Sequence, residues 1–323
     1  MTRTAYAQAG VDVDAGERAV ALMRRHARSL SGEFASIAAV PPGMREPLVV
    51  SATDGVGTKT DIARRLGRYD TIGQDLVAMC ADDIVCHGAA PSFFLDYVAV
   101  GRIVPEQVAE IVGGIAAACE EIGCDLLGGE TAEHPGLMGE DEFDLAGFCV
   151  GFVERANLVD GSAARAGDAV IGLASSGLHS NGFSLIRRLI DDGRLPLTEE
   201  LLTPTRLYAR TVLDLGGVHG MAHITGGGLA RNLPRAMGAA LGVRVNPSTW
   251  QQPGIFDDVA RAAGMDATEM RATFNCGIGF ALIVERDAAE SVLGLLEGRG
   301  VEAWRIGSVR PIDELGASRY VEA

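Results

Sequence analysis

Short apolar runs and longer amphipathic stretches follow one another along most of the chain. Apolar runs of strand length occupy residues 48–52, 93–100, 124–128, 145–153, 169–173, 280–284 and 301–306, and a further strand ends at residues 226–228. Apolar residues three or four positions apart cover residues 16–30, 71–88, 105–122, 205–215 and 288–296, and another helix follows Ser180. The pattern predicts strands that alternate with amphipathic helices.

Two stretches without a clear period shape the expected organisation. Residues 129–144 are polar and glycine-rich, so we expect a long loop after the strand at 124–128. The chain turns at residues 165–168 and restarts with an apolar run, which indicates a domain boundary there. A length of 323 residues fits about two domains. We therefore predict domains of residues 1–166 and 167–323.

Composition and charge exclude several classes of protein. The chain is 47% hydrophobic and 22% charged, as in globular proteins. It has no uninterrupted apolar run of about 18 residues and no apolar signal core at its start, so we expect a cytoplasmic protein without membrane spans. A formal charge of −15 argues against a nucleic-acid partner. The six cysteines lack zinc-site spacing and are expected to be buried, reduced thiols.

The loop at residues 54–60 is the first candidate for chemistry. It follows an apolar run that is expected to form a buried strand, and it combines Asp54 with two glycines, two threonines and Lys59. Its backbone N–H groups could approach an anion, and Asp54 would suit a phosphate that carries a divalent cation. The spacing does not match a P-loop. A tight turn with a lysine whose stem packs on the surface is the structural alternative.

Clustered acids are the second candidate. On the helix at 71–88, the carboxylates of Asp75, Asp82 and Asp83 fall within about 100° of arc. A solvated acidic face is the alternative, but no lysine or arginine lies between Asp70 and Arg102 to offset these charges. Two carboxylates 4 Å apart repel by about 4 kcal/mol at an effective dielectric of 20, and Mg²⁺ would remove that cost.

Two further stretches complete the candidate site. Residues 128–136 place Glu130 after a glycine pair at a strand end, as Asp54 is placed. Residues 175–182 form a glycine-rich turn that opens a helix, where backbone N–H groups favour phosphate. Two strand-end acids, an acidic helix and an anion-binding turn predict a magnesium–triphosphate site.

The motifs together resemble one known family, the phosphoribosylformylglycinamidine cyclo-ligases, also called aminoimidazole ribonucleotide synthetases. The resemblance runs in order from Tyr6 to about Pro311. The residues that carry it are 53–59, 70–73, 75–79, 128–136, 146–151, 175–182, 225–228 and 273–277.

The resemblance implies an ATP- and Mg²⁺-dependent ring closure in de novo purine biosynthesis. ATP would activate the formyl oxygen of formylglycinamidine ribonucleotide, and an internal nitrogen would then close the imidazole ring. The implied fold is α+β: an N-terminal α+β domain whose sheet pairs across a homodimer into a barrel, followed by a C-terminal α/β domain. The nucleotide would lie close to the dimer interface.

The same resemblance implies roles for individual residues. The Mg²⁺ ligands would be Asp54, Asp83 and Glu130, with Asp75 as a further candidate. The ATP site would comprise Asp54, Gly55, Gly57, Thr58, Lys59, Asp75, Gly129, Glu130 and Thr131. The substrate site would comprise Ser176, Gly177, His179, Ser180, Asn181 and Asn275, and the catalytic residues would be Lys59, His179 and Asn181.

The chain departs from the family pattern in several places. The segment at 31–36 is shorter than the usual glycine-rich loop, Gln8 stands where an acid is usual, and Asp82 stands where asparagine is common. A catalytically silent nucleotide-binding dimer and a related kinase or synthetase of the same superfamily therefore stay open as alternatives. Among the other histidines, His87 and His223 are interpreted as structural.

Overall fold

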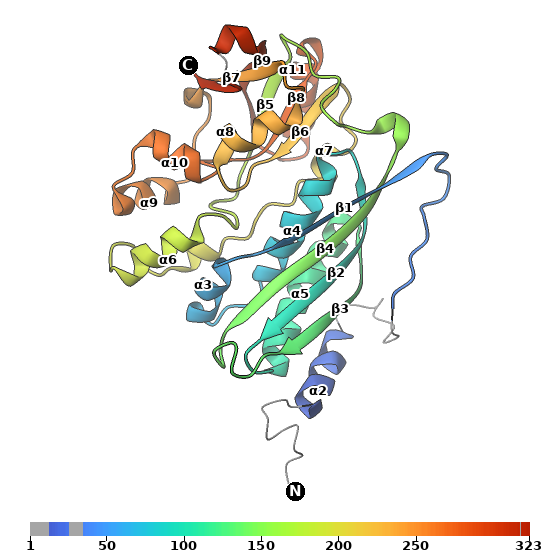
Figure 1. Cartoon of the computed structure of the whole chain (residues 1–323), viewed down its shortest axis with the longest axis vertical. Helices are drawn as coiled ribbons and strands as arrows, with labels where there is room; N and C mark the ends of the chain where they lie inside the picture. Colours follow the sequence, from blue (N-terminus) through green and yellow to red (C-terminus); the bar gives the residue numbers. More distant parts are fainter. Residues whose placement is uncertain (1–12, 26–34, 317) are drawn as a thin grey trace, which may run out of the picture.

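The computed structural model of the protein describes residues 13–25, 35–316 and 318–323. These residues form two β-sheets, each with its own helices (Figure 1). The first sheet takes its strands from residues 47–154 and the second from residues 169–322, so the predicted boundary at 166 and 167 falls in the connection between them. Among the described residues, no helix is long and apolar enough to span a membrane. Gln8 and residues 31–34 lie outside the described residues.

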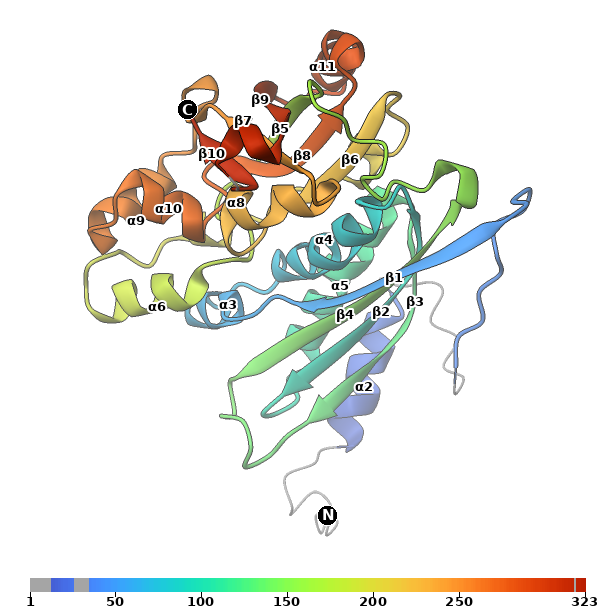
Figure 2. The same ribbon diagram turned by 45° about the horizontal axis from the view of Figure 1, so that its top comes forward.

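The N-terminal sheet is mixed. Its strands lie in the order β1-β4-β2-β3, with β2 and β3 parallel and the other pairs antiparallel. They are β1 (Pro47–Gly55), β2 (Ala90–Val100), β3 (Asp125–Glu133) and β4 (Phe143–Glu154). The helix α5 (Pro105–Ile122) connects the parallel pair, as such a crossover requires. It packs with α4 (Ile72–Val85) on one face of the sheet, and α2 (Val13–Met23) packs against α5 (Figure 2).

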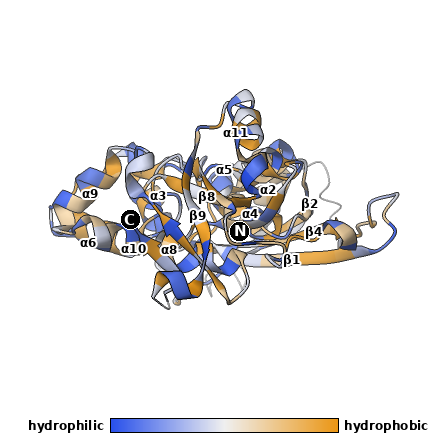
Figure 3. Ribbon diagram, turned by 90° about the horizontal axis from the view of Figure 1, so that it is seen from above, coloured by the Kyte–Doolittle hydropathy of each residue, from blue (hydrophilic) through white to orange (hydrophobic). Residues whose placement is uncertain are grey.

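The opposite face of this sheet is open in the described chain. Side chains along β1 alternate between the two faces, so that Leu48 and Val50 pack on the core while Val49 is 66% exposed. Phe148 of β4, opposite Thr53 in the ladder, is 45% exposed on the same face. Figure 3 shows β1 as a largely hydrophobic strand at the edge of the molecule. The expectation of a buried strand at 48–52 is therefore wrong: one face of it is open.

The C-terminal sheet is the centre of a three-layer domain. Its strand order is β10-β7-β9-β5-β8-β6, and every residue of β5 and β8 is buried. The strands are β5 (Ala169–Ala174), β6 (Val218–His223), β7 (Leu241–Val245), β8 (Ile278–Val284), β9 (Ala303–Pro311) and β10 (Tyr320–Glu322). Val170 and Ile283 face one apolar cluster while Ile171 and Leu282 face the other. Strands covered on both faces give uninterrupted apolar runs, as this sequence has.

Short helices surround this sheet. α11 (Ala289–Gly298) packs into one cluster through Val292 and Leu296, and α8 (Gly228–Asn232) packs into the other through Leu229. The remaining helices are α6 (Phe183–Asp191), α7 (Ala209–Val212), α9 (Ile255–Ala263) and α10 (Ala267–Thr273).

Most predicted elements are confirmed, including the helix at 105–122 with unchanged bounds, but two stretches near the candidate site differ. Residues 129–133 continue strand β3 instead of opening a loop, because they pair with β2 up to Val100 and Glu133. Residues 59–66 form the helix α3 (Lys59–Leu66), which was not predicted because the glycines before it indicated a loop. The spacing of Ile62 and Leu66 is nevertheless that of a helix.

The predicted helix at 205–215 is also largely wrong, because only Ala209–Val212 is helical. The backbone N–H groups of Thr205 and Tyr208 donate to the carboxylates of Asp75 and Asp82, at 2.8 and 3.0 Å, and not to helix carbonyls. The first predicted helix, at 16–30, begins earlier and ends at Met23, and residues 26–30 lie outside the described chain.

One buried carboxyl group in the N-terminal sheet has an oxygen without a hydrogen-bond partner. Asp96 of β2 is 8% exposed, and its Oδ2 accepts no hydrogen bond from the described residues. Its side chain covers Gly129 of β3, where a Cβ atom would come far too close to Oδ1. Burial raises the pKa of Asp96 to about 7, because the charged form loses its hydration.

This pKa predicts that Asp96→Asn changes how stability depends on pH. The folded protein holds the Asp96 proton up to about pH 7, whereas the unfolded chain releases it near its ordinary pKa of 3.8. As the pH rises between those two values, deprotonation in the unfolded chain but not in the folded protein lowers the free energy of unfolding by about 1.4 kcal/mol per pH unit. Urea unfolding at pH 5, 6, 7 and 8 should show the variant gaining on wild type up to about pH 7. Asp125→Asn replaces an exposed acid on β3 and is the control for removing one carboxyl group from the protein.

Candidate functional site

Three ionisable groups from both domains meet beside the edge strand β1. Asp54, near the end of β1, points to the side of the sheet that α4 covers, where Asp83 lies. His223, at the end of β6, places its Nδ1 3.0 Å from Asp83 Oδ1. Burial, and then the negative charge of Asp83, raise the pKa of Asp54. The structure thus brings two of the proposed magnesium ligands together and adds a histidine between the domains.

A cavity of about 280 Å³ opens beside this cluster, between β1 and α4 on one side and β6 with the residues after α8 on the other. Polar groups on its wall come from both domains and from the connection between them: Ser51, Asp83, His87, Asp160, His223, Asn232 and Arg235. His223 is 4% exposed, and its Nε2 is buried without a hydrogen-bond partner among the described residues. A buried polar atom of this kind is costly unless a bound molecule satisfies it.

His223 is the main residue that the sequence interpretation missed. The sequence predicts a structural strand residue, and His223 does lie on a strand. Its position as the last residue of β6, two residues before the 225–228 motif, was the available signal, because loops that follow strands often carry functional residues.

Lys59 and Asp75 form a closed network instead of an open ligand site. Neither side chain is exposed, and Lys59 Nζ lies 2.8 Å from Asp75 Oδ2 and 2.9 Å from Oδ1. Nζ also donates to the carbonyl oxygen of Thr203. Asp75 Oδ1 accepts further hydrogen bonds from Thr205, through N at 2.8 Å and Oγ1 at 2.6 Å, and from Ser180 Oγ at 3.1 Å.

This network joins the two domains, since Lys59 and Asp75 belong to the first and the other residues to the second. Burial lowers the pKa of Lys59, and the charge of Asp75 opposes that shift. The structure does not place either group where it could touch a phosphate or a metal ion. Roles for Lys59 at a phosphate and for Asp75 at Mg²⁺ stay predictions that this arrangement does not display.

The turn at residues 175–182 is held by its own histidine. His179 adopts the left-handed conformation with φ of 60°, and its Nε2 accepts a hydrogen bond from Ser176 N at 3.2 Å. It is 1% exposed, and burial lowers its pKa well below the ordinary value. The imidazole is therefore neutral and faces the protein interior, where it supports the turn. Its assignment as a substrate contact or proton carrier stays a prediction.

A second strained loop fixes the same turn from the other side. Cys276 has φ of 45°, and the neighbouring Asn275 donates from Nδ2 to the Gly177 carbonyl oxygen at 2.9 Å. Ser175 N donates to the Gly277 carbonyl oxygen. Non-glycine residues in this region cost free energy and often mark functional sites. Asn181 lies beside the glycine motif, because a Cβ atom on Gly226 would meet its Oδ1 at 3.3 Å.

The glycines after Asp54 shape the start of α3. A Cβ atom on Gly55 would lie 2.9 Å from the Leu145 carbonyl oxygen, and Gly57 has φ of 65°. Asp54 Oδ1 accepts a hydrogen bond from Gly55 N at 2.7 Å. Thr58 Oγ1 lies 3.3 Å from Ser184 Oγ at the start of α6, so this loop touches the second domain.

The structure separates Glu130 from the other acids. The ladder aligns Asp54 with Gly147, then Asp96, then Gly129, so these four positions share one face of the sheet. Glu130 follows in β3 and is exposed on the opposite face, as strand alternation requires. Three strand spacings, about 14 Å, also lie between the two edge strands. Within one chain, Glu130 does not join Asp54 and Asp83, and the described residues contain no cluster of three potential metal ligands.

Family models match both parts of the chain. Residues 37–153 match the N-terminal domain of "AIR synthase related protein", and residues 165–317 match its C-terminal domain. Solved structures with the same fold include a hydrogenase maturation protein HypE in complex with ATP, with a TM-score of 0.70 and 19% identity over 95% of this chain and 90% of that one. A thiamine-monophosphate kinase from Stenotrophomonas maltophilia has a TM-score of 0.67 and 18% identity, covering 95% of this chain and 94% of that one.

Curated relatives are much closer in sequence. A phosphoribosylformylglycinamidine cyclo-ligase from Pseudothermotoga lettingae is 48% identical over 326 residues, covering 95% of this chain and 97% of the relative. One from Desulfitobacterium hafniense is 48% identical over 325 residues, covering 94% and 96%. The motif-based resemblance is confirmed, and the chain belongs to the phosphoribosylformylglycinamidine cyclo-ligase family.

Proposed function

We propose that this protein uses ATP to convert formylglycinamidine ribonucleotide to aminoimidazole ribonucleotide, a step of purine biosynthesis. The observation that carries the proposal is the contact of Asp83 with His223 at a cavity lined by both domains of a cyclo-ligase family member, with Asp54 close enough to Asp83 for the charge of Asp83 to raise its pKa. The cavity is large enough for part of a nucleotide-sized ligand and carries groups of both charges.

The proposed reaction needs no nucleophile from the protein. The terminal phosphoryl group of ATP passes to the formyl oxygen of the substrate. An internal nitrogen then attacks the formyl carbon that carries this oxygen. Phosphate then leaves with that oxygen, and the nitrogen loses a proton as the ring closes. Such chemistry depends on placing the reactants, stabilising the transferred charge and excluding water. A site built from both domains suits the placing of two substrates side by side.

The carboxylates at the site fit a divalent cation. Asp54 and Asp83 are close enough for the charge of one to raise the pKa of the other, and a hard cation offsets such repulsion. We assign these two residues to Mg²⁺, which would supply charge neutralisation for the phosphates of ATP. Mg²⁺ commonly takes only one or two carboxylates and leaves its other positions to water and phosphate, so two suffice.

We also propose that the N-terminal sheet pairs with that of a second chain to form a barrel. Val49 and Phe148 leave an apolar patch on its open face, and β1 and β3 have unpaired edges in the described chain. Because β3 is an edge strand, we propose that Gly129, Glu130 and Thr131 lie where the two chains meet and contribute to the ATP site of the partner chain from that edge. The proposed nucleotide contacts Gly55, Gly57 and Thr58 belong to the chain's own site.

For the substrate we propose the turn at 175–182, where Ser176, Gly177 and Asn181 would contact its phosphate or amidine. His179, Ser180 and Asn275 would hold the turn in shape, because each already binds a group of the turn or of the network beneath it. A neutral, fully buried imidazole suits such a supporting role better than proton transfer.

The proposed activity is tested with purified protein, Mg-ATP and formylglycinamidine ribonucleotide, by following ADP and aminoimidazole ribonucleotide together. We expect one-to-one formation of both, and Asp54→Asn should lower the rate by at least about 100-fold, as expected when a group that stabilises transferring charge is lost. Thermal unfolding should change little, because Asp54 lies at a strand end beside a cavity.

ADP without the imidazole product would indicate a different acceptor. ATP binding without either product would favour a silent nucleotide-binding protein, and a variant that unfolds would count against a catalytic role for Asp54.

Asp75→Asn should behave in the opposite way. It leaves Lys59 buried without its counter-charge, so the free energy of unfolding should fall by roughly 3–5 kcal/mol in urea titrations. The double variant Lys59→Met with Asp75→Leu removes both charges and should recover much of the loss. A stable Asp75→Asn protein without turnover would instead support Asp75 as a magnesium ligand.

The proposed dimer predicts that Val49→Arg weakens association. The substitution places a charge in the apolar face that would line the barrel, so light scattering should show monomers at concentrations where wild type is dimeric. Val20→Arg changes an exposed apolar residue of α2 away from this face and should leave the mass unchanged. A wild-type monomer at all concentrations would contradict the barrel.

A further inference from the structure

A ladder of polar contacts joins the helices that begin directly after the two candidate loops. α3 follows the Asp54 loop and α6 follows the turn at 175–182, and their first turns lie side by side (Figure 1). Three contacts join them in order along the helices: Thr58 Oγ1 with Ser184 Oγ at 3.3 Å, Arg187 Nε with Asp61 Oδ2 at 2.8 Å, and Arg65 Nη1 with Asp191 Oδ1 at 2.6 Å.

The spacing shows that one face of each helix makes the ladder. The positions 58, 61 and 65, from the residue before α3 to its last turn, and 184, 187 and 191 on α6, are three and four residues apart. Other faces of the two helices pack in the main core, where Ile62 and Ile186 are buried. The polar ladder therefore adds to this core packing and fixes how the helices lie along their more exposed faces.

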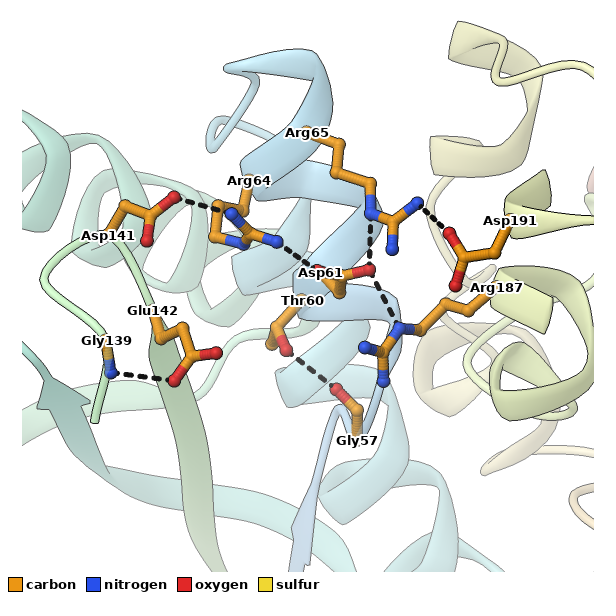
Figure 4. A network of polar contacts seen from close by, with 10 residues as sticks. All are labelled: Gly57, Thr60, Asp61, Arg64, Arg65, Gly139, Asp141, Glu142, Arg187 and Asp191. Atoms are coloured by element: carbon orange, nitrogen blue, oxygen red, sulfur yellow. Dashed lines mark hydrogen bonds and ion pairs between the residues drawn. The ribbon is translucent and has the colours of Figure 1, made fainter. Parts of the chain in front are cut away.

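Asp61 is the centre of this ladder (Figure 4). Its side chain is only 12% exposed, and its oxygens accept from Arg64 Nη2 at 2.6 Å, Arg65 Nε at 2.7 Å and Arg187 Nε at 2.8 Å. Burial alone would raise the pKa of Asp61, but these three arginines together hold it below its usual value. Asp61 is therefore charged whenever the protein is folded near neutral pH, and it binds arginines of both domains at once.

A second contact of the cluster stays within the first domain and offers an internal comparison. Arg64 Nη1 donates to Asp141 Oδ2 at 2.5 Å, and Asp141 lies in the connection between β3 and β4. Asp141 is 69% exposed and touches neither α6 nor the turn before it among the contacts of Figure 4. Removing Asp141 takes one carboxylate from the cluster but leaves the ladder between the domains intact.

We propose that Asp61 is a positioning residue of the ring-closing reaction: by binding Arg187 and Arg65 it fixes the substrate turn of one domain against the nucleotide loop of the other. The inference rests on the proposed function, because it takes the two loops to hold the two substrates. A displacement of about 1 Å between reacting groups can cost about 100-fold in rate. A ladder that fixes their separation therefore affects turnover without touching either substrate.

The kinetic test compares Asp61→Asn, Asp61→Glu and the control Asp141→Asn. We expect Asp61→Asn to lower kcat/KM for formylglycinamidine ribonucleotide at least about tenfold, while the Kd for ATP measured alone stays within about twofold. Asp61→Glu keeps the charge and should recover part of the loss, and Asp141→Asn should match wild type. Unchanged kinetics of Asp61→Asn, or an equal loss in Asp141→Asn, would overturn the proposal.

A structural measurement separates this inference from the proposed function. Hydrogen–deuterium exchange of the peptide that covers residues 175–184 should become faster in Asp61→Asn and stay unchanged in Asp141→Asn. This measurement requires no turnover, so it shows whether Asp61 fixes the turn at 175–182 even if wild type makes no aminoimidazole ribonucleotide. Should Asp61→Asn fail to fold, Asp191→Asn replaces it, because it removes the contact of Arg65 with α6 and leaves Asp61 and its arginines in place. Exchange of the same peptide should again become faster, and unchanged exchange would contradict the ladder.

Discussion

The relative placement of the two domains depends on one buried ion pair. Lys59 and Asp75 have no exposed side-chain surface, so both ions lose their water when the chain folds. That loss costs several kcal/mol per ion, and attraction between the ions offsets it only where further donors and acceptors are well placed. The second domain supplies them, through the carbonyl of Thr203 and the donors of Thr205. The buried charges of Lys59 and Asp75 therefore have these further hydrogen-bond partners only when the second domain is docked in this position.

The same segment of the second domain gives three acids of one helix three different environments. Asp75 is fully buried and bound by Lys59 and Thr205, and Asp82 is fully buried and accepts from Tyr208 N, where burial raises its pKa to about 7. Asp83 lies one position further along and is 43% exposed beside the cavity. Helical geometry puts all three on one arc, but the segment at 203–208 covers only part of it. Covering by a neighbouring segment, not charge alone, decides which carboxylate is open to a ligand.

Features that depend on neighbouring residues in the sequence could be predicted, whereas contacts between residues far apart in the sequence could not. Strands and helices with a strong period were predicted well, because their signal is local. The partners of Lys59 in the folded chain, Asp75 and the carbonyl of Thr203, could not be predicted, because they lie 16 and 144 residues away in the sequence. His223 looked structural because its partner Asp83 is 140 residues away. The helix expected at 205–215 failed for the same reason, since carboxylates of α4 take its N–H groups.

The open face of the N-terminal sheet connects the fold to the site. In the isolated chain this face leaves apolar side chains exposed, leaves the edges of β1 and β3 unpaired, and holds Glu130 away from Asp54. In the proposed barrel the edge of β1 would lie against β3 of the partner chain, which would bury the apolar face and pair the edges. The same step would place β3 of the partner beside the strand that carries Asp54, with Asp54 on the helix-covered face and Glu130 of that strand on the inner face of the barrel. One association would thus bury the apolar face of the sheet and bring the Asp54 loop next to the partner chain.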